Sequence, residues 1–254
     1  MRFRILALAL AGLLTLSGGA EASELTLYIV RHGKTMLNTT DRVQGWSDAV
    51  LTPEGEAVVK AAGRGLKDVA FQAAYSSDSG RAMQTARLIL GESKTSGTLS
   101  LATDSRLREF NFGTFEGDLN KTMWSAIAAD RGITLEEFLK DLDPESFANS
   151  VAKLDAKNPE AAKNWPAENY RQITDRLTAG VAEIVKTESA RGEGNVLIVS
   201  HGLSIMALLD TLFPDFKAPK GGLKNASVTI VKVKDGAYAL EKVNDLSFVE
   251  AGGK

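Results

Sequence analysis

The chain has no cysteine, and only two histidines and three tryptophans occur among its 254 residues. The absence of cysteine excludes disulfide bonds, thiolate metal sites and a cysteine-linked lipid anchor, so packing alone must stabilise the fold. Basic and acidic residues are nearly equal in number, and the formal net charge is −2, which argues against nucleic acid or an anionic membrane surface as a partner. Because histidines are so few, the position of each one is informative about function.

The first 22 residues have the pattern of a secretory signal peptide. Two arginines in MRFR precede the apolar run ILALALAGLLTL, and AEA at positions 20–22 is a small-x-small cleavage pattern. This apolar run is shorter than the roughly 20 residues that span a bilayer, so an uncleaved membrane anchor is the weaker alternative. We expect cleavage after Ala22, with Ala20 as the nearby alternative, and an exported, periplasmic or secreted protein without stable membrane association. Loss of two arginines and one glutamate changes the formal net charge from −2 to −3.

Apolar runs alternate with helical patterns along the rest of the chain. Thr52 and Pro53 have the residue types of a helix cap and a first helical position. The alternation predicts an α/β fold, a three-layer α/β/α sandwich around a mostly parallel sheet. The predicted strands are 25–30, 71–76 and 195–200, and the predicted helices are 52–69, 80–92 and 166–189.

Two further segments complete the predicted organisation. Residues 118–164 are polar and helical in pattern, and we expect them to form a helical insertion, or lid, over the active-site edge of the sheet. Residues 226–245 alternate in polarity around Asp235-Gly236, which predicts a hairpin at the C-terminal edge. We therefore expect residues 23–254 to be one catalytic domain.

Each predicted parallel strand is followed by residues suited to phosphate chemistry. Arg31 and His32 end the first, Arg81 comes shortly after the second, and His201 follows the third. Ligands of open α/β sheets bind at the carboxyl ends of strands, so we expect these side chains to meet there. Guanidinium groups suit bidentate phosphate binding, and a neutral histidine beside them can be a covalent nucleophile. Taken singly, each residue is as well explained by a structural hydrogen bond or ion pair.

The segment RHGKTMLN at residues 31–38 resembles the signature of the histidine phosphatase superfamily, the phosphoglycerate-mutase-like proteins. Four more segments are similar to motifs of that family, in the family's order: RVQGWSDAVLTPEG, YSSDSGRAMQTA, LREFNFGTFEG and VLIVSHG. The resemblance implies that His32 is the nucleophile that becomes phosphorylated. It also implies that Arg31, Arg81 and His201 hold the phosphoryl oxygens, and that Glu109 protonates the leaving oxygen and then helps to activate water.

The resemblance also implies phosphate-pocket contacts from Asn38, Gln44 and Gly45, and no cofactor or metal. The chain departs from the family pattern at three positions: Lys34 replaces a common glutamate or glutamine, Val50 a frequent proline, and Asn111 a frequent aspartate. None of these changes removes an implied catalytic group. Asn111 leaves Glu109 as the only acid among the neighbouring residues REFNF.

Glu109 also has a case that is independent of the resemblance. A leaving alkoxide needs a proton, and a carboxylic acid held in an apolar site can supply it. Its neighbour Phe110 suits partial burial. The alternative for this carboxylate is an ion pair with Arg106 or Arg108.

We expect a phosphomonoesterase acting on a phosphorylated small molecule. LREFNFGTFEG looks like the phosphatase branch, and export would separate a glycolytic mutase from its metabolites. The alternatives are a mutase-type phosphoryl transferase, a metal-dependent hydrolase and a non-catalytic phosphate-binding module. Two histidines are few for a zinc site, and the retained nucleophile and acid argue against a module. Trp46, Phe112 and Phe115 are candidates to line or cover the mouth of the pocket, and the alternative, which is the commoner case for aromatic side chains, is packing in the core or the lid.

Overall fold

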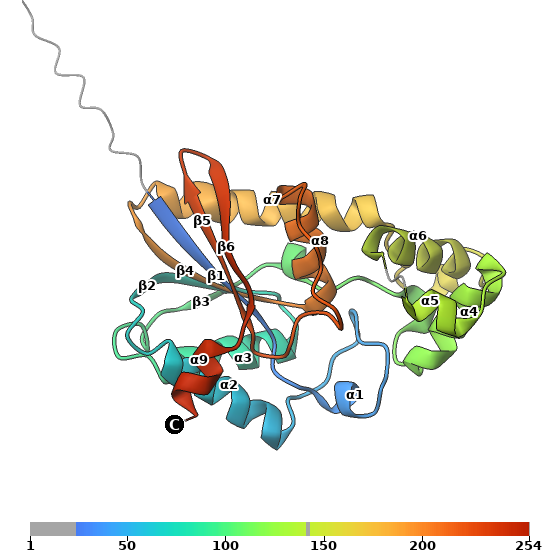
Figure 1. Ribbon diagram of the computed structural model, residues 1–254, viewed down its shortest axis with the longest axis horizontal. Coiled ribbons are helices and arrows are strands. Elements are labelled where there is room, and N and C mark those ends of the chain that lie inside the picture. Colours follow the sequence, from blue (N-terminus) through green and yellow to red (C-terminus); the bar gives the residue numbers. More distant parts are fainter. Residues whose placement is uncertain (1–23, 141–142, 254) are drawn as a thin grey trace, which may run out of the picture.

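The structure, a computed structural model, describes residues 24–140 and 143–253. Within them the chain forms a six-stranded sheet in the order β3-β2-β4-β1-β5-β6 (Figure 1). Strands β1 to β4 run parallel, whereas β5 is antiparallel to both β1 and β6. This arrangement confirms the mostly parallel sheet and the C-terminal edge hairpin. The strands are β1 (Glu24–Arg31), β2 (Phe71–Ser76), β3 (Leu101–Thr103), β4 (Gly194–Ser200), β5 (Val228–Lys234) and β6 (Ala237–Asp245).

Helices cover both faces of the sheet, as the three-layer prediction requires (Figure 1). One face packs against α2 (Pro53–Gly65), α3 (Gly80–Gly91) and α9 (Ser247–Gly252), and the other against α7 (Tyr170–Ser189) and α8 (Gly202–Leu212). Side chains of β4 alternate between the two cores, with Val196 and Ile198 in one and Leu197 and Val199 in the other. A strand buried on both sides needs such a continuous apolar run.

Local capping explains where two of the predicted helices begin. The Thr52 side chain accepts a hydrogen bond from the Gly55 amide, and Pro53 takes the first position of α2. The predicted start of α7 at Pro166 is wrong, because the helix begins at Tyr170. Asn169 and Gln172 form a reciprocal capping box that sets this start.

Some elements were not predicted from the sequence. Helix α8 is buried along most of its length, so it lacks the polar face on which helical periodicity depends. The others are short: α1 (Met36–Thr39), strand β3, helix α9, and the 3₁₀ turns η1 (Ser105–Leu107), η2 (Gly113–Phe115) and η3 (Ala161–Lys163).

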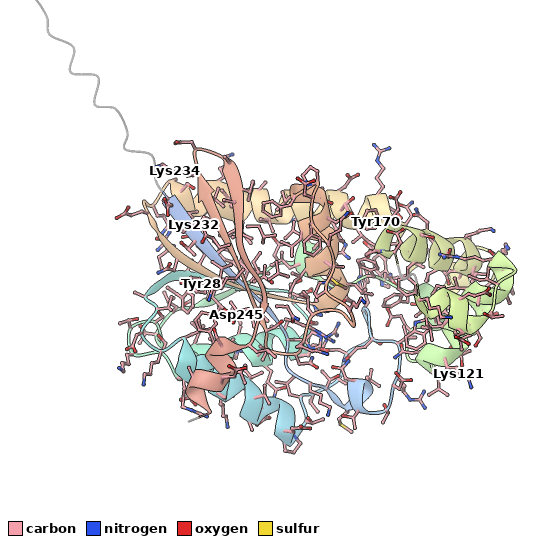
Figure 2. All side chains as sticks on the ribbon, viewed as in Figure 1. Tyr28, Lys121, Tyr170, Lys232, Lys234 and Asp245 are labelled. Carbon is pink, nitrogen blue, oxygen red and sulfur yellow. The ribbon has the colours of Figure 1, made fainter. Side chains whose placement is uncertain are left out.

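The helices of residues 118–164 form a helical lobe beyond the carboxyl ends of the parallel strands (Figure 1). This lobe consists of α4 (Asn120–Arg131), α5 (Leu135–Lys140) and α6 (Pro144–Asp155). Figure 2 shows Tyr170 where α7 meets the lobe; its amide donates to Asn149 of α6 and its hydroxyl to Asp210 of α8. These hydrogen bonds therefore join the lobe to the helices that pack on the sheet.

The predicted signal peptide, residues 1–22, lies outside the described residues. In the described part of the chain, no helix combines the length and apolarity needed to cross a membrane.

Candidate active site

The pairing of β1 with β4 determines where the two histidines lie. The strands are parallel and in register, with Arg31 opposite Ser200, so His32 and His201 leave the sheet side by side. The His32 amide donates to the Ser200 carbonyl at 3.0 Å. The imidazole centroids are 5.2 Å apart, and both rings are buried. The predicted meeting of the two imidazoles is therefore found in the structure.

Hydrogen bonds define the tautomers of the two rings. Nδ1 of His32 lies 2.8 Å from the Gly33 carbonyl, which can only accept, so Nδ1 carries the proton and Nε2 a lone pair. Nε of Arg81 donates to Nδ1 of His201 at 3.2 Å, so the proton of that neutral ring is on Nε2. One imidazole thus presents a nucleophilic nitrogen and the other a hydrogen-bond donor.

Burial and nearby charge keep both imidazoles neutral. Burial, followed by the guanidinium groups of Arg81 and Arg31, holds the pKa of His32 well below 6.5, although the bond to Gly33 opposes this. Burial, Arg81 and the neighbouring His32 likewise hold the pKa of His201 well below 6.5. A histidine must be uncharged to attack phosphorus, so this environment suits a nucleophile.

Arg81 is fully buried and is already engaged by the protein. Besides His201, it donates to the carbonyls of Gly45 and Ser47 and to the Asp48 carboxylate, at 2.7, 3.0 and 2.9 Å. These bonds use most of its five N–H donors. In this structure Arg81 therefore orients His201 and the loop of residues 45–48, in addition to placing positive charge beside both histidines.

Arg31 and Gln44 carry buried donors without partners among the described residues. These are Nε of Arg31 and Nε2 of Gln44. Nε of Arg31 lies against Gly202, where an added Cβ would be 3.2 Å away, so glycine lets the guanidinium sit beside His201. Buried donors require acceptors, and oxygens of a bound phosphate would supply them.

The remaining predicted pocket residues lie on the loops beside this group. Asn38 caps α1 through Thr35, and its Nδ2 donates to Oε1 of Gln44 at 3.4 Å. Asn38 therefore supports the Gln44 amide. Gly45 lines the cavity, and a Cβ there would collide with the Phe110 carbonyl and Glu116. The loop can approach this closely only because residue 45 is glycine.

Glu109 is buried at the N-terminus of α8. One carboxylate oxygen accepts from the Ser204 amide and hydroxyl at 2.8 and 2.9 Å, and the other from the Leu203 amide at 3.1 Å. The expected apolar surrounding is therefore wrong, since helix N–H groups and a hydroxyl hold the carboxylate. The alternative of an ion pair with Arg106 or Arg108 is also not observed. Those arginines pair with Asp104 and Asp78 respectively.

Two residues that were not predicted from the sequence hold the loops of the site in place through hydrogen bonds. The Glu116 carboxylate accepts hydrogen bonds from the amides of Gly45, Trp46 and Ser47. It therefore fixes the same loop, residues 45–48, to which Arg81 donates. Arg176 of α7 donates to the carbonyls of residues 106, 108 and 109 and so holds the segment that carries Glu109. Glu116 was visible in LREFNFGTFEG, but nothing in the local pattern around Arg176 indicates its contact across nearly 70 residues.

A cavity of about 500 Å³ opens beside this constellation. His201 and Glu109 line it together with the loop of residues 45–48. Asn164 and Trp165, which follow the helical lobe in the sequence, line it as well. Trp46 lines the cavity as predicted, but Phe112 and Phe115 do not. They belong to the hydrophobic core, with Phe112 against Phe147. Within the described residues, no group of three or more His, Cys, Asp or Glu side chains could hold a metal ion.

Fold and site together define an α/β protein with paired histidines and arginines at the carboxyl ends of its parallel strands, and sequence comparison gives its family. The profile of the histidine phosphatase superfamily (branch 1) matches residues 27–156 and 126–246. The chain belongs to this superfamily.

Its relatives include both mutases and phosphatases. The chain is 29% identical over 237 residues to the probable phosphoglycerate mutase GpmB of Shigella boydii serotype 18, covering 89% of this chain and 96% of that protein. It is 40% identical in sequence to a phosphoglycerate mutase from Bacillus anthracis str. Sterne. The crystal structure of that protein matches with a TM-score of 0.83 over 92% of this chain and 98% of that one. A mycobacterial glucosyl-3-phosphoglycerate phosphatase, solved with VO3, is 26% identical, with a TM-score of 0.61 over 88% of this chain and 100% of that one.

The low pKa values of the two histidines predict a pH-dependent stability. Below pH 6.5 the unfolded chain binds protons that the folded chain does not, so the free energy of unfolding falls as the pH falls. Because the chain has only two histidines, we expect uptake of up to two protons on unfolding between about pH 6.5 and 5, before most carboxylates titrate. Urea titrations at several pH values measure this slope, and His201→Asn should reduce it by about one proton. A flat profile over this range in the unsubstituted protein would contradict the assignment.

Proposed function

We propose that the chain is a phosphomonoesterase that works through a phosphohistidine on His32. The observation that carries this proposal is the hydrogen bonding of the two imidazoles, which assigns them complementary tautomers. Nε2 of His32 carries a lone pair, and Nε2–H of the adjacent His201 can donate to a phosphoryl oxygen. Membership of the superfamily supports the same chemistry and a phosphorylated small molecule as substrate.

In the first step, Nε2 of His32 attacks phosphorus while the ester P–O bond breaks, and the Glu109 carboxyl proton passes to the leaving oxygen. In the second step, water attacks phosphorus, the N–P bond breaks and the water proton returns to Glu109. Arg31 and the His201 donor stabilise the negative charge on the transferred group in both steps. Phosphate and an alcohol are the products.

The charges of the cavity favour hydrolysis over phosphoglycerate mutation. A mutase has to hold a substrate that carries a second anionic group beside the transferred phosphate. Arg108 is the only cation among the described residues that line the cavity, and Asp78 already pairs with it through two bonds of 2.7 and 2.6 Å. Asp48, which also lines the cavity, pairs with the buried Arg81, and Glu116 adds negative charge to the same wall. A second anion would therefore meet mainly like charge.

A phosphoglycerate mutase is the second candidate. The 40% identity to the Bacillus anthracis protein, over nearly the whole of both chains, favours it. The two candidates share the phosphohistidine step and differ in which molecule next receives the phosphoryl group.

Product analysis of the chain from residue 23 onward distinguishes these functions. We expect phosphate release from p-nitrophenyl phosphate, inhibition by vanadate, and no isomerisation of 3-phosphoglycerate by ³¹P NMR. His32→Ala should lower hydrolysis by at least about 10³-fold and abolish an acid-labile phosphoryl group on the protein. Lys34→Ala is the matched control, because Lys34 is half-exposed and pairs only with Glu54.

Three outcomes would contradict this proposal in different ways. Isomerisation of 3-phosphoglycerate with little phosphate release would make the chain a mutase. Activity that is lost with a chelator and restored by a metal would favour metal-dependent hydrolysis. Binding of phosphate esters that survives His32→Ala, without turnover in the unsubstituted protein, would indicate a binding module.

The role of Glu109 can be tested with leaving groups of different quality. Glu109→Gln keeps the shape of the side chain but cannot supply the proton. We expect kcat/KM, which reports the first step alone, to fall by about 10²- to 10⁴-fold for an alkyl phosphate and far less for p-nitrophenyl phosphate, because the leaving group of the latter needs little protonation. Equal losses for both substrates would indicate a structural role.

We also propose that the protein is exported and that Ser23 begins its mature form. The supporting features are the basic start, the apolar run and the AEA pattern of residues 1–22. N-terminal sequencing of protein recovered from the periplasm or the medium should begin at Ser23, or at Glu21 if cleavage follows Ala20. An intact Met1 on the recovered protein would refute export by cleavage.

A further inference from the structure

Two tryptophans form an aromatic wall of the cavity. The rings of Trp46 and Trp165 lie 5.6 Å apart at an angle of 54°, and both line the cavity. Trp165 remains 68% exposed, which is unusual for so large an apolar side chain. An exposed indole at the mouth of a polar cavity is available to contact a bound molecule.

Both tryptophans are held in place by the surrounding structure. Nε1 of Trp46 donates to the Glu109 carbonyl at 3.0 Å, so this ring is fixed relative to the proposed proton donor. The guanidinium of Arg108 lies 4.6 Å from the Trp46 ring centre. The aromatic wall is thus tied directly to the catalytic segment.

Trp165 stands in a short segment that is anchored on both sides. Its amide donates to Oδ1 of Asn164, and Pro166 restricts it to an extended conformation. The next amide, of Ala167, donates to the buried Asp155 at 2.8 Å, and the amide of Glu168 donates to the Asn111 carbonyl at 3.0 Å. These hydrogen bonds therefore fix the backbone segment that carries the exposed ring.

The direction of the leaving group follows from the chemistry. The phosphoryl group must lie at His32 and His201, and the leaving oxygen must lie within reach of Glu109. His201 and Glu109 form one part of the cavity lining, and Trp46 and Trp165 form another. The body of the leaving group therefore extends into the cavity and against the aromatic wall.

Polar groups around this wall suit hydroxyls. The carboxylates of Asp48 and Asp78 keep acceptor lone pairs beside the bonds that they accept from Arg81 and Arg108. Nδ2 of Asn111 and Nδ2 of Asn164 have no partner among the described residues, and both side chains line the cavity, so they offer donors. A hydroxyl group can donate to the first set and accept from the second, whereas an anion can use only the second.

We infer that the cavity binds a leaving group that is an uncharged ring bearing several hydroxyls, a cyclic polyol monophosphate, whose face packs on Trp165. The inference rests on the proposed phosphomonoesterase function and names its substrate class. The ring face supplies apolar contact to the indole, and its hydroxyls meet the carboxylates and amides beside it. The aromatic wall, and not the phosphate contacts, therefore selects among leaving groups.

The test compares two phosphate esters in one set of variants. Glucose 6-phosphate presents a hydroxylated ring, and glycerol 3-phosphate is a polyol without a ring. We expect Trp165→Ala to lower kcat/KM for glucose 6-phosphate roughly tenfold, mainly through KM, and to leave glycerol 3-phosphate within about twofold. Trp165→Phe should restore most of the loss. Leu139→Ala, which truncates another exposed apolar side chain outside the cavity lining, is the control and should change neither substrate.

The outcomes separate this inference from the function on which it rests. If no phosphate ester is hydrolysed by the unsubstituted protein, the proposed function fails first. If esters are hydrolysed but Trp165→Ala affects both substrates equally or neither, the hydrolase stands and the ring-binding inference is overturned. Melting temperatures of all variants establish that they remain folded, which the exposure of Trp165 leads us to expect.

Discussion

The in-register pairing of β1 with β4 is the constraint on which the site depends. Arg31 faces Ser200 across the ladder, so the next residue of each strand is a histidine and the two imidazoles lie together. A shift of one residue in this register would separate the rings and reverse which face each strand side chain meets. The two hydrophobic cores that fix the register therefore also fix the catalytic geometry.

Around this pair, buried polar groups are held by partners from distant parts of the chain. Arg81 links His201 to the loop of residues 45–48, Glu116 holds the same loop from the other side, and Arg176 holds the Glu109 segment. Buried charges cost free energy unless they are paired and hydrogen-bonded, and these bonds satisfy that condition. Their combined effect is a buried site in which guanidinium groups lie beside two neutral imidazoles.

The same charges set limits on the substrate. The guanidinium groups of Arg31 and Arg81 lie beside the two histidines, whereas the rest of the cavity wall combines carboxylates, amides, two indoles and Arg108, whose charge Asp78 offsets. We propose that a single phosphate binds in the first environment and an uncharged hydroxylated body in the second. The relatives include both mutases and a phosphatase, so family membership alone leaves this choice open, and the proposal of hydrolysis rests on the charge of the wall.

Much of the fold followed from local patterns in the chain. Apolar runs located β1, β2 and β4, and turn residues located the β5–β6 hairpin, because strand burial and turn geometry depend on nearby residues. Helix α8 was not predicted, since burial along most of its length hides periodicity, and the start of α7 was misplaced, since a capping box can override a proline signal. The five motifs also named the residues that gather at the strand ends.

By itself, the sequence determined which chemical groups stand at the strand ends and that no thiol takes part. Only the tertiary structure decided their protonation and orientation. The carbonyl that sets the His32 tautomer belongs to the next residue, Gly33, but the tautomer of His201 depends on the guanidinium of Arg81, 120 residues away. Glu109 is likewise held by the amides of a helix almost 100 residues away. It also placed Trp165 beside Trp46. Such contacts join residues far apart in the chain, and no local pattern specifies them, because they exist only once the sheet and its helices have packed.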